Sequence, residues 1–497
     1  MTEKFGHVAR LRGGIFGLQK DALYIADPLA LNSVLVRDQD NFTESTEFSG
    51  LFGVIHHGSS LASVTGPDHK KQRRILNPIF TAKFVSKLAP VFYGVSHQLR
   101  DKLADDVRSH PDGRTVDILD YLTRAALEMI SQGGIGHTFH SFDEQSREFE
   151  EFHHALQTVL PTAGRLFFVL PFLESWRKLK PIWLRHLLAG AVGYLPWPSA
   201  RQFKWAIDTM HVRCRVLFYQ KRAMLEGGRV SDTKGSTGIG KDLVTVLMSA
   251  NADAGDGDKM PDGDIIANMS SIVLGGQETT SGALSRLLCL MVQDVDLQAR
   301  LRAEVTGAYA TTADNYLSYK ELNSLPVLDA VCREALRLYS PVTFVWRETK
   351  EDCVVPLQFP LRDTSGAEIR EVLVTKGTSV YIGLAAANRS AAIWGEDVNE
   401  LRPERWLGKN IADATSNGVK MPGIFSNIMT FLGGGRACPG MKFALLEIKI
   451  VLSVLLAEFE FQAVPEEIDW RQGITVVPYV KGKERQGPSV PMTVKIM

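Results

Sequence analysis

The sequence is poor in cysteine, in net charge and in long apolar runs. Its 497 residues include five cysteines, an odd and sparse number that excludes a disulfide scaffold and is typical of a reducing compartment. Lysine plus arginine number 56, as do aspartate plus glutamate, so the chain lacks the basic excess of a dedicated nucleic-acid binder. It has no run of about 18 uncharged apolar residues, and residues 1–16 lack a signal-peptide core. What remains is a globular composition with 45% apolar residues.

Hydrophobic periodicity and turn signals predict several helices and a few strands along the chain. Alternation in residues 7–11 and 22–26 predicts a strand pair, and Asp27-Pro28 carries the signals of a helix start. A central helix of roughly 30 residues is expected from Asp264 to about Asp294. The other expected elements are a helix opened by Gly66-Pro67-Asp68, helices within 85–135, strands near 353–359 and 372–382, and a helix over 441–456. The length alone predicts about three domains, although no linker marks a boundary.

Residues 160–198 are crowded with aromatic and aliphatic side chains and interrupted by prolines. One interpretation is buried core between short helices. The other is an apolar surface that rests on a bilayer or admits apolar substrates. The sequence leaves both interpretations open.

The strongest chemical signal is a glycine-rich loop from Phe431 to Gly440 that delivers Cys438 to the start of a helix. Backbone N–H groups and the positive end of the helix favour a thiolate there, and glycines such as Gly434 allow a flat partner to approach the backbone. Arg436 adds a cation two residues away. A phosphate loop would need a Lys-Ser/Thr pair, and a zinc site a second Cys or His nearby, and neither is present.

This segment resembles the haem-binding loop of cytochrome P-450 monooxygenases, Phe-x-x-Gly-x-Arg-x-Cys-x-Gly, and Phe431, Gly434, Arg436, Cys438 and Gly440 occupy all five fixed positions. The resemblance implies that Cys438 is the thiolate ligand of haem b iron. It also implies that residues 1–497 form one large, mostly α-helical domain with small β-sheets around the haem, in place of three domains. The match looks closest to fungal members.

The central helix carries Gly275-Gly276-Gln277-Glu278-Thr279. Two glycines inside a helix cost about 1 kcal/mol each relative to alanine, so they need a reason. One reason is close packing against a neighbour, and the other is space for O₂ or a flat group. The segment is similar to the family pattern Ala/Gly-Gly-x-Asp/Glu-Thr. That resemblance implies that Thr279 hydrogen-bonds the activated oxygen and that Glu278 relays protons through water.

Glu334 and Arg337 are three residues apart on one helix, which by itself describes an ordinary salt bridge. The resemblance adds Arg405, in a Pro-Glu-Arg segment, and implies a structural triad that braces the loop of Cys438. It further implies that His69, Arg73, Arg347 and Arg436 bind the haem propionates, although a basic helix face is usually only solvated.

No flavin or nicotinamide motif is present, so the resemblance implies electrons from an NADPH-cytochrome reductase. Basic residues are expected to form its docking surface: Lys70, Lys71, Arg74, Lys442 and Lys449. The substrate is expected to be an apolar small molecule of terpenoid, steroid, fatty-acyl or polycyclic aromatic type. Such a protein would act in fungal secondary metabolism or xenobiotic oxidation.

Three alternatives remain: an isomerase, dehydratase or peroxygenase of the same fold; a non-catalytic haem-binding protein; and an unrelated enzyme with Cys438 as nucleophile. Microsomal members carry an N-terminal membrane helix and a hinge, and this sequence starts where the hinge would end. The resemblance therefore leaves three alternatives open: a lost anchor, an incomplete sequence or a peripheral protein. The resemblance implies the cytosolic face of the endoplasmic reticulum membrane, with a cytoplasmic or peripheral location as the alternative.

Overall fold

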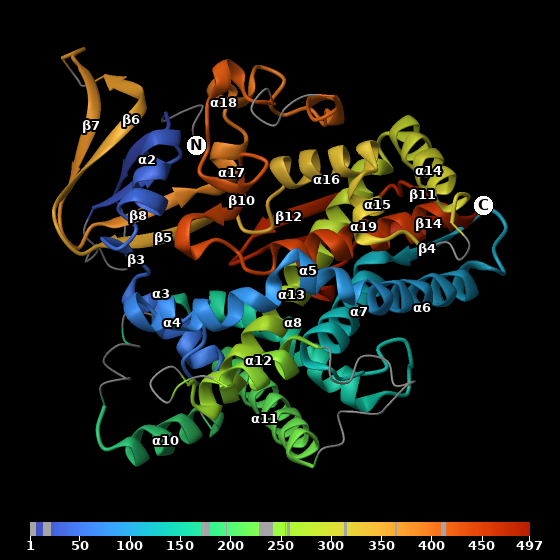
Figure 1. Cartoon of the computed structure of the whole chain (residues 1–497), viewed down its shortest axis with the longest axis horizontal. Coiled ribbons are helices and arrows are strands. Elements are labelled where there is room, and N and C mark those ends of the chain that lie inside the picture. The colour runs from blue at the N-terminus through green and yellow to red at the C-terminus, as the bar shows by residue number, and fades with distance from the viewer. Residues whose placement is uncertain are drawn as a thin grey trace. The chain divides into compact units, whose positions relative to one another are not determined.

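A computed structural model describes residues 6–12, 21–169, 172, 179–194, 196–227, 242–253, 255, 259–312, 316–362, 365–408 and 414–497 (Figure 1). The chain divides into two compact units. Unit 1 holds residues 1–45 and 324–441, and unit 2 holds residues 46–323 and 442–497. The prediction of a single domain remains a prediction.

Unit 1 is built on a five-stranded sheet of order β1-β2-β8-β5-β3. Strands β2 and β8 are parallel, and the other neighbours are antiparallel. Two hairpins, β6–β7 and β9–β10, complete its strands. The bounds are β1 (Val8–Leu11), β2 (Ala22–Ile25), β3 (Phe42–Thr43), β5 (Phe344–Thr349), β6 (Cys353–Arg362), β7 (Glu368–Val374), β8 (Ser379–Gly383), β9 (Gly423–Phe425) and β10 (Ile428–Gly433).

Short helices join these strands, and a buried carboxylate fixes the first of them. The side chain of Asp27 accepts hydrogen bonds from the backbone N–H groups of Leu29 and Ala30 and, in β6, of Gln358 and Phe359. An N-cap that also binds a neighbouring strand is strongly constrained. The helices are α2 (Pro28–Asn32), η2 (Ser33–Arg37), α16 (Pro326–Leu338), α17 (Leu384–Asn388), α18 (Ala391–Trp394) and η11 (Gly434–Arg436).

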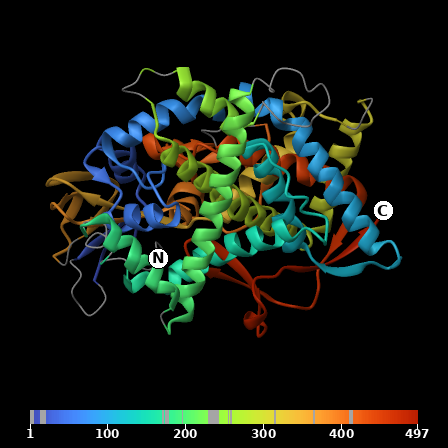
Figure 2. The same ribbon diagram turned by 90° about the horizontal axis from the view of Figure 1, so that it is seen from below.

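Unit 2 is mostly helical, and its centre is the long helix α13 (Asp262–Met291), against which α7 (Ile118–Ile130) packs. Helices α8 (Arg147–Arg165) and α11 (Pro198–Glu226) lie side by side (Figure 2). The others are α3 (Thr46–Ile55), α4 (Gly66–Leu76), α5 (Ala82–Val85), α6 (Ala89–Val107), η5 (Ser131–Ile135), α10 (Ile182–Ala191), α12 (Leu243–Asp253), α14 (Val295–Tyr309), α15 (Tyr319–Asn323) and α19 (Met441–Glu458).

Two small antiparallel sheets complete unit 2. One has the order β11-β14-β4, and the other is the hairpin β12–β13. Their bounds are β4 (Arg114–Asp117), β11 (Phe459–Gln462), β12 (Ile468–Gln472), β13 (Val476–Val480) and β14 (Pro491–Ile496).

The structure confirms the mostly α-helical class, the first strand pair, the central helix and the helix after Cys438. The single strand expected over 372–382 is wrong, because the chain turns between β7 and β8. Gly377 has a φ of 74° in that turn, and its N–H donates to the carbonyl of Thr349 at 2.8 Å. A left-handed residue cannot continue a strand.

The described part of 160–198 favours its second interpretation, because large apolar side chains there are exposed. Phe172, Trp183, Leu187 and Tyr194 are 68%, 63%, 62% and 91% exposed. Residues 170, 171, 173–178 and 195 lie outside the described residues. None of the described helices combines the length and apolar character needed to cross a bilayer.

Candidate functional site

The cysteine loop closes on itself through two backbone hydrogen bonds, of which one runs from the N–H of Ala437 to the carbonyl of Gly434 at 3.1 Å. The N–H of Cys438 donates to the carbonyl of Phe431 at 2.9 Å, which fixes the cysteine three residues before α19. All five cysteines lie in the described part of the chain, and Cys438 is the only exposed one. An accessible sulfur near a helix start can act as a ligand or nucleophile, which a buried thiol cannot.

Tight packing within unit 1 explains the glycine at position 434. Gly434 has a φ of 69°, and a β-carbon there would overlap the carbonyl oxygen of Leu35 in η2. The N–H of Gly435 donates to Oε1 of Gln39 at 2.8 Å, and the ring of Phe431 packs edge-on against Phe425. Gly434 therefore allows the loop to pack against η2 of the same chain. This role differs from the expected one, in which the glycine allows a flat partner to approach the backbone.

Two of the predicted propionate ligands share a buried acid that the sequence analysis missed. Arg347 Nη2 lies 3.3 Å from Glu44 Oε1, and Arg436 Nη2 lies 2.6 Å from Glu44 Oε2. Burial lowers the pKa of Arg347, and the negative charge of Glu44 opposes that change. Arg347 and Arg436 together can bind an anion. In this structure that anion is the carboxylate of Glu44. No local pattern connects Glu44 to arginines hundreds of residues away.

Glu334, Arg337 and Arg405 come together as predicted, in a buried network of unit 1. Glu334 and Arg337 are fully buried and paired twice, Arg337 Nε to Oε2 at 2.9 Å and Nη2 to Oε1 at 2.8 Å. Arg405 Nε lies 3.5 Å from Oε1 of Glu334, and the indole N–H of Trp406 donates to Oε2 at 2.9 Å. Every charge therefore has partners, as a buried ion pair requires.

The network reaches the cysteine loop through Asn388. Arg337 Nη1 donates to the carbonyl of Asn388 at 2.9 Å. The side chain of Asn388 then accepts from the N–H of Met429 at 2.6 Å and donates to Thr430 Oγ1 at 2.9 Å. Both belong to β10, the strand that ends in the loop. A change at Glu334 can therefore displace the segment that carries Cys438.

Both explanations for the glycine pair of α13 apply, one to each glycine. A β-carbon at Gly276 would lie 2.9 Å from Cγ1 of Ile130 in α7, so this glycine allows close helix packing. A β-carbon at Gly275 would have no atom within 4 Å, so this glycine borders open space. The hydroxyl of Thr279 donates to the carbonyl of Gly275 at 2.7 Å. Gly275 is therefore exposed on the helix, one turn before the hydroxyl group of Thr279.

Glu278, next to that hydroxyl, points to a different element. Its Oε1 accepts a hydrogen bond from Oγ1 of Thr475 at 2.5 Å, just before β13. Burial raises the pKa of Glu278 to about 7, and the hydrogen bond from Thr475 opposes that rise. A carboxyl group with this pKa can both give and take a proton near neutral pH. Sequence reasoning missed Thr475, which lies 197 residues away.

His69 and Arg73 lie one turn apart on α4 in unit 2, with His69 buried and Arg73 half-buried. Their convergence with Arg347 and Arg436 on one group remains a prediction.

The expectation that Lys449 belongs to the reductase docking surface is wrong. Lys449 is only 2% exposed, because α19 is buried along this stretch, and its Nζ donates to Oδ1 of Asn323 at 2.7 Å.

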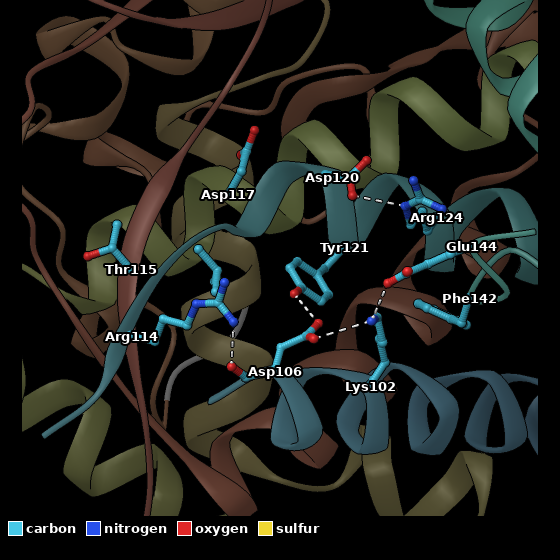
Figure 3. Close-up of a pocket in the computed structure, with 11 residues that line it drawn as sticks. Lys102, Asp106, Arg114, Thr115, Asp117, Asp120, Tyr121, Arg124, Phe142 and Glu144 are labelled. Atoms are coloured by element: carbon cyan, nitrogen blue, oxygen red, sulfur yellow. Dashed lines mark hydrogen bonds and ion pairs between the residues drawn. The ribbon is translucent and has the colours of Figure 1, made fainter. Parts of the chain in front are cut away.

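A pocket of about 320 Å³ in unit 2 contains none of the predicted site residues (Figure 3). Its charged groups pair with one another: Lys102 with Asp106 and Glu144, and Arg124 with Asp120. The hydroxyl of Tyr121 donates to Asp106 at 2.5 Å. Arg114 and Asp117 also line the pocket, and burial raises the pKa of Asp117.

Unit 1 holds an exposed cysteine at a helix start and a pair of arginines suited to carboxylates. Unit 2 holds a helix with an acid and a hydroxyl in adjacent positions. Each set is of the type that a haem-thiolate protein uses. The donor set fits haem. The sequence model of the family described as Cytochrome P450 matches residues 1–478, and the chain belongs to that family.

Similar proteins come from fungi. Cytochrome P450 monooxygenase 81 of Postia placenta is 36% identical over 490 residues, which cover 99% of this chain and 86% of that protein. Cytochrome P450 monooxygenase 91 of the same fungus is 37% identical over 494 residues, with 99% and 88% covered. Ganoderic acid synthetase of Ganoderma lucidum is 34% identical over 500 residues, with 100% and 89% covered.

Membership makes the protein a monooxygenase among the oxidoreductases. The family binds haem with a cysteine thiolate and uses O₂, a small-molecule substrate and a redox partner.

Proposed function

We propose that the protein inserts one oxygen atom from O₂ into an apolar small molecule, with Cys438 as the thiolate ligand of haem b. The exposed Cys438, held by its hydrogen bond to Phe431 at the start of α19, carries this proposal. When bound, haem supplies the activation of O₂ and the transfer of one oxygen atom. The haem propionates are bound by His69, Arg73, Arg347 and Arg436. Arg347 and Arg436, which pair with Glu44 in this structure, bind a propionate in place of that carboxylate.

The carbon monoxide difference spectrum of the reduced protein tests the ligand. The wild-type protein is expected to show the strongly red-shifted band of thiolate ligation, and Cys438→Ser is expected to lose it. The matched control is Cys353→Ser, which changes a half-buried cysteine of β6 and should keep the band. A red-shifted band in Cys438→Ser would refute the assignment. Product that carries no label from ¹⁸O₂ would refute the monooxygenase reaction.

Glu278 and Thr279 move protons in this proposal. Glu278 titrates near neutral pH, so it can take a proton from water and release it within the site. The hydroxyl of Thr279 has its own acceptor at Gly275, which orients it along the helix. Glu278→Gln is expected to keep bound haem and to divert reduced oxygen into hydrogen peroxide. Full coupling of NADPH use to product in this variant would contradict the relay.

The substrate is a terpenoid, and the pathway is one of secondary metabolism. The support is the similarity to ganoderic acid synthetase. Spectral titration of the haem protein with a tetracyclic triterpenoid, a long-chain fatty acid and a polycyclic hydrocarbon tests this. The terpenoid should bind most tightly, and preference for either other compound would contradict the substrate class.

Electrons come from an NADPH-cytochrome reductase that docks on Lys70, Lys71, Arg74 and Lys442. Lys70 and Arg74 are exposed along α4, where an acidic partner can approach them. The double reversal Lys70→Glu/Arg74→Glu should slow reduction by the reductase and leave reduction by dithionite unchanged. Equal rates with the reductase would refute this surface.

The protein touches the endoplasmic reticulum membrane through the exposed apolar side chains of 160–198. Tyr194, Phe172 and Trp183 are of the kind that enters a lipid interface. Co-sedimentation with phosphatidylcholine vesicles should fall in the variant Trp183→Ser/Leu187→Ser. Undiminished binding would exclude this segment as the contact.

A further inference from the structure

The tip of the hairpin β12–β13 is attached to helix α13 at two points. Thr475, which precedes β13 and is 5% exposed, donates its hydroxyl proton to Glu278 Oε1 at 2.5 Å. Two turns further along α13, the guanidinium of Arg286 lies over the ring of Trp470 in β12, 4.4 Å from its centre. The second contact fixes the hairpin, so the position of Thr475 beside Glu278 does not depend on their hydrogen bond alone.

Thr475 is the single hydrogen-bond donor to the carboxyl group of Glu278 within the described part of the chain. The other oxygen, Oε2, is buried and has no partner there. The charged groups of the elements packed on α13 are engaged elsewhere. Glu128 of α7 accepts from Gln132, Thr138 and Ser141, and Lys221 of α11 pairs with Asp242. Apart from burial, the hydroxyl group of Thr475 therefore sets the ionisation state of the Glu278 carboxyl group.

The contact also sets the direction in which Glu278 points. The adjacent Thr279 donates to Gly275, so the acid and the hydroxyl of the family pattern have separate partners in this structure. For Glu278 to pass a proton toward Thr279, its carboxyl group must leave Thr475. The proton that it releases is replaced by one from water.

We infer that Thr475 is a positioning residue for proton delivery, which holds the carboxylate of Glu278 turned toward the hairpin until it takes up a proton. The inference rests on the proposed relay role of Glu278. A donor to the ionised form stabilises that form, so removal of the hydroxyl favours the protonated acid. The loss of one charge-assisted hydrogen bond corresponds to an upward shift of about one pKa unit, a tenfold change in proton affinity.

The experiment compares Thr475→Val with wild type, Thr475→Ser and the control Thr493→Val, which removes an exposed hydroxyl bonded to Thr115 on a strand of the same unit. Infrared titration follows the carbonyl band of the protonated carboxyl, assigned by its absence in Glu278→Gln. We expect the midpoint to rise by about one unit in Thr475→Val and to return toward wild type in Thr475→Ser. The pH at which product coupling declines should shift upward in parallel.

An unshifted midpoint in Thr475→Val would overturn the inference, as would a shift of the same size in Thr475→Ser or Thr493→Val. Thr475→Ala removes the hydroxyl with a smaller side chain and must shift the midpoint in the same direction if Thr475→Val does not fold. The two proposals fail differently. Full coupling in Glu278→Gln removes the relay role and the inference with it. Uncoupling in Glu278→Gln with no shift in Thr475→Val overturns the inference alone.

Discussion

Glu334→Gln is the substitution for which the structure allows the sharpest estimate. The carboxylate accepts at both oxygens: Arg337 Nε and the indole of Trp406 at Oε2, and Arg337 Nη2 and the N–H of Arg402 at Oε1. Glutamine replaces one oxygen by an NH₂ group. Arg405 Nε adds a third donor at Oε1, so the new NH₂ group faces two donors in one orientation and three in the other. The fully buried charge of Arg337 also loses its counter-charge.

Two estimates of the loss of unfolding free energy in Glu334→Gln agree. Two unsatisfied buried donors cost about 1–3 kcal/mol each, and a buried ion pair that loses one partner costs about 3–5 kcal/mol. The expected loss of unfolding free energy is therefore about 3–5 kcal/mol, a large part of the roughly 5–15 kcal/mol that stabilises a typical protein. Because Asn388 links Arg337 to β10, the thiolate-type carbon monoxide band should decrease at urea concentrations that leave the helical circular dichroism intact.

Urea unfolding followed by circular dichroism and by the carbon monoxide band measures both effects. The matched control is Glu368→Gln, which breaks the exposed pair Glu368–Arg370 of β7 and should cost no more than about 1 kcal/mol. Equal unfolding midpoints for Glu334→Gln and Glu368→Gln would refute the reasoning. So would full stability together with loss of the band, because the network would then tune the ligand without supporting the fold.

Three further predictions concern the helices of unit 2. Gly276→Ala should lower the unfolding free energy by about 1–3 kcal/mol, because its β-carbon meets Ile130 at 2.9 Å, whereas Gly275→Ala should raise it by up to about 1 kcal/mol. Equal urea midpoints for the two variants would contradict this. Thr279→Ala should keep the haem spectrum and increase peroxide per NADPH, and an unchanged ratio would count against a role in oxygen chemistry. Burial raises the pKa of Glu447 well above its ordinary value, so the native state keeps a proton that the unfolded chain releases. Stability should fall as pH rises above about 4.5, and the advantage of Glu447→Gln should grow by about 1.4 kcal/mol per pH unit as long as the native state keeps the proton. Parallel stability curves for the two proteins would show that the group is ionised in both states.

The cysteine loop and the central helix could be predicted because their chemistry lies in adjacent residues. The five fixed positions from Phe431 to Gly440 lie within ten residues of one another. The same is true of Gly275 to Thr279, where two glycines break the helix propensity that surrounds them. Helix periodicity likewise identified α13 and α19, because each buries a long apolar surface. These features need no knowledge of distant contacts.

Only the tertiary structure decided which groups form ion pairs and hydrogen bonds with the residues of those motifs. Glu44 meets Arg347 and Arg436, and Thr475 meets Glu278, across sequence separations that no local pattern spans. The burial of Lys449 is of the same kind, because its charge predicts a surface and only the packing of α19 places it inside. Sequence by itself therefore determined the reactive side chains of this protein, since they are fixed by covalent neighbourhood. Folding decided their partners, orientation and proton affinities, since desolvation and hydrogen bonding depend on what the rest of the chain packs around them.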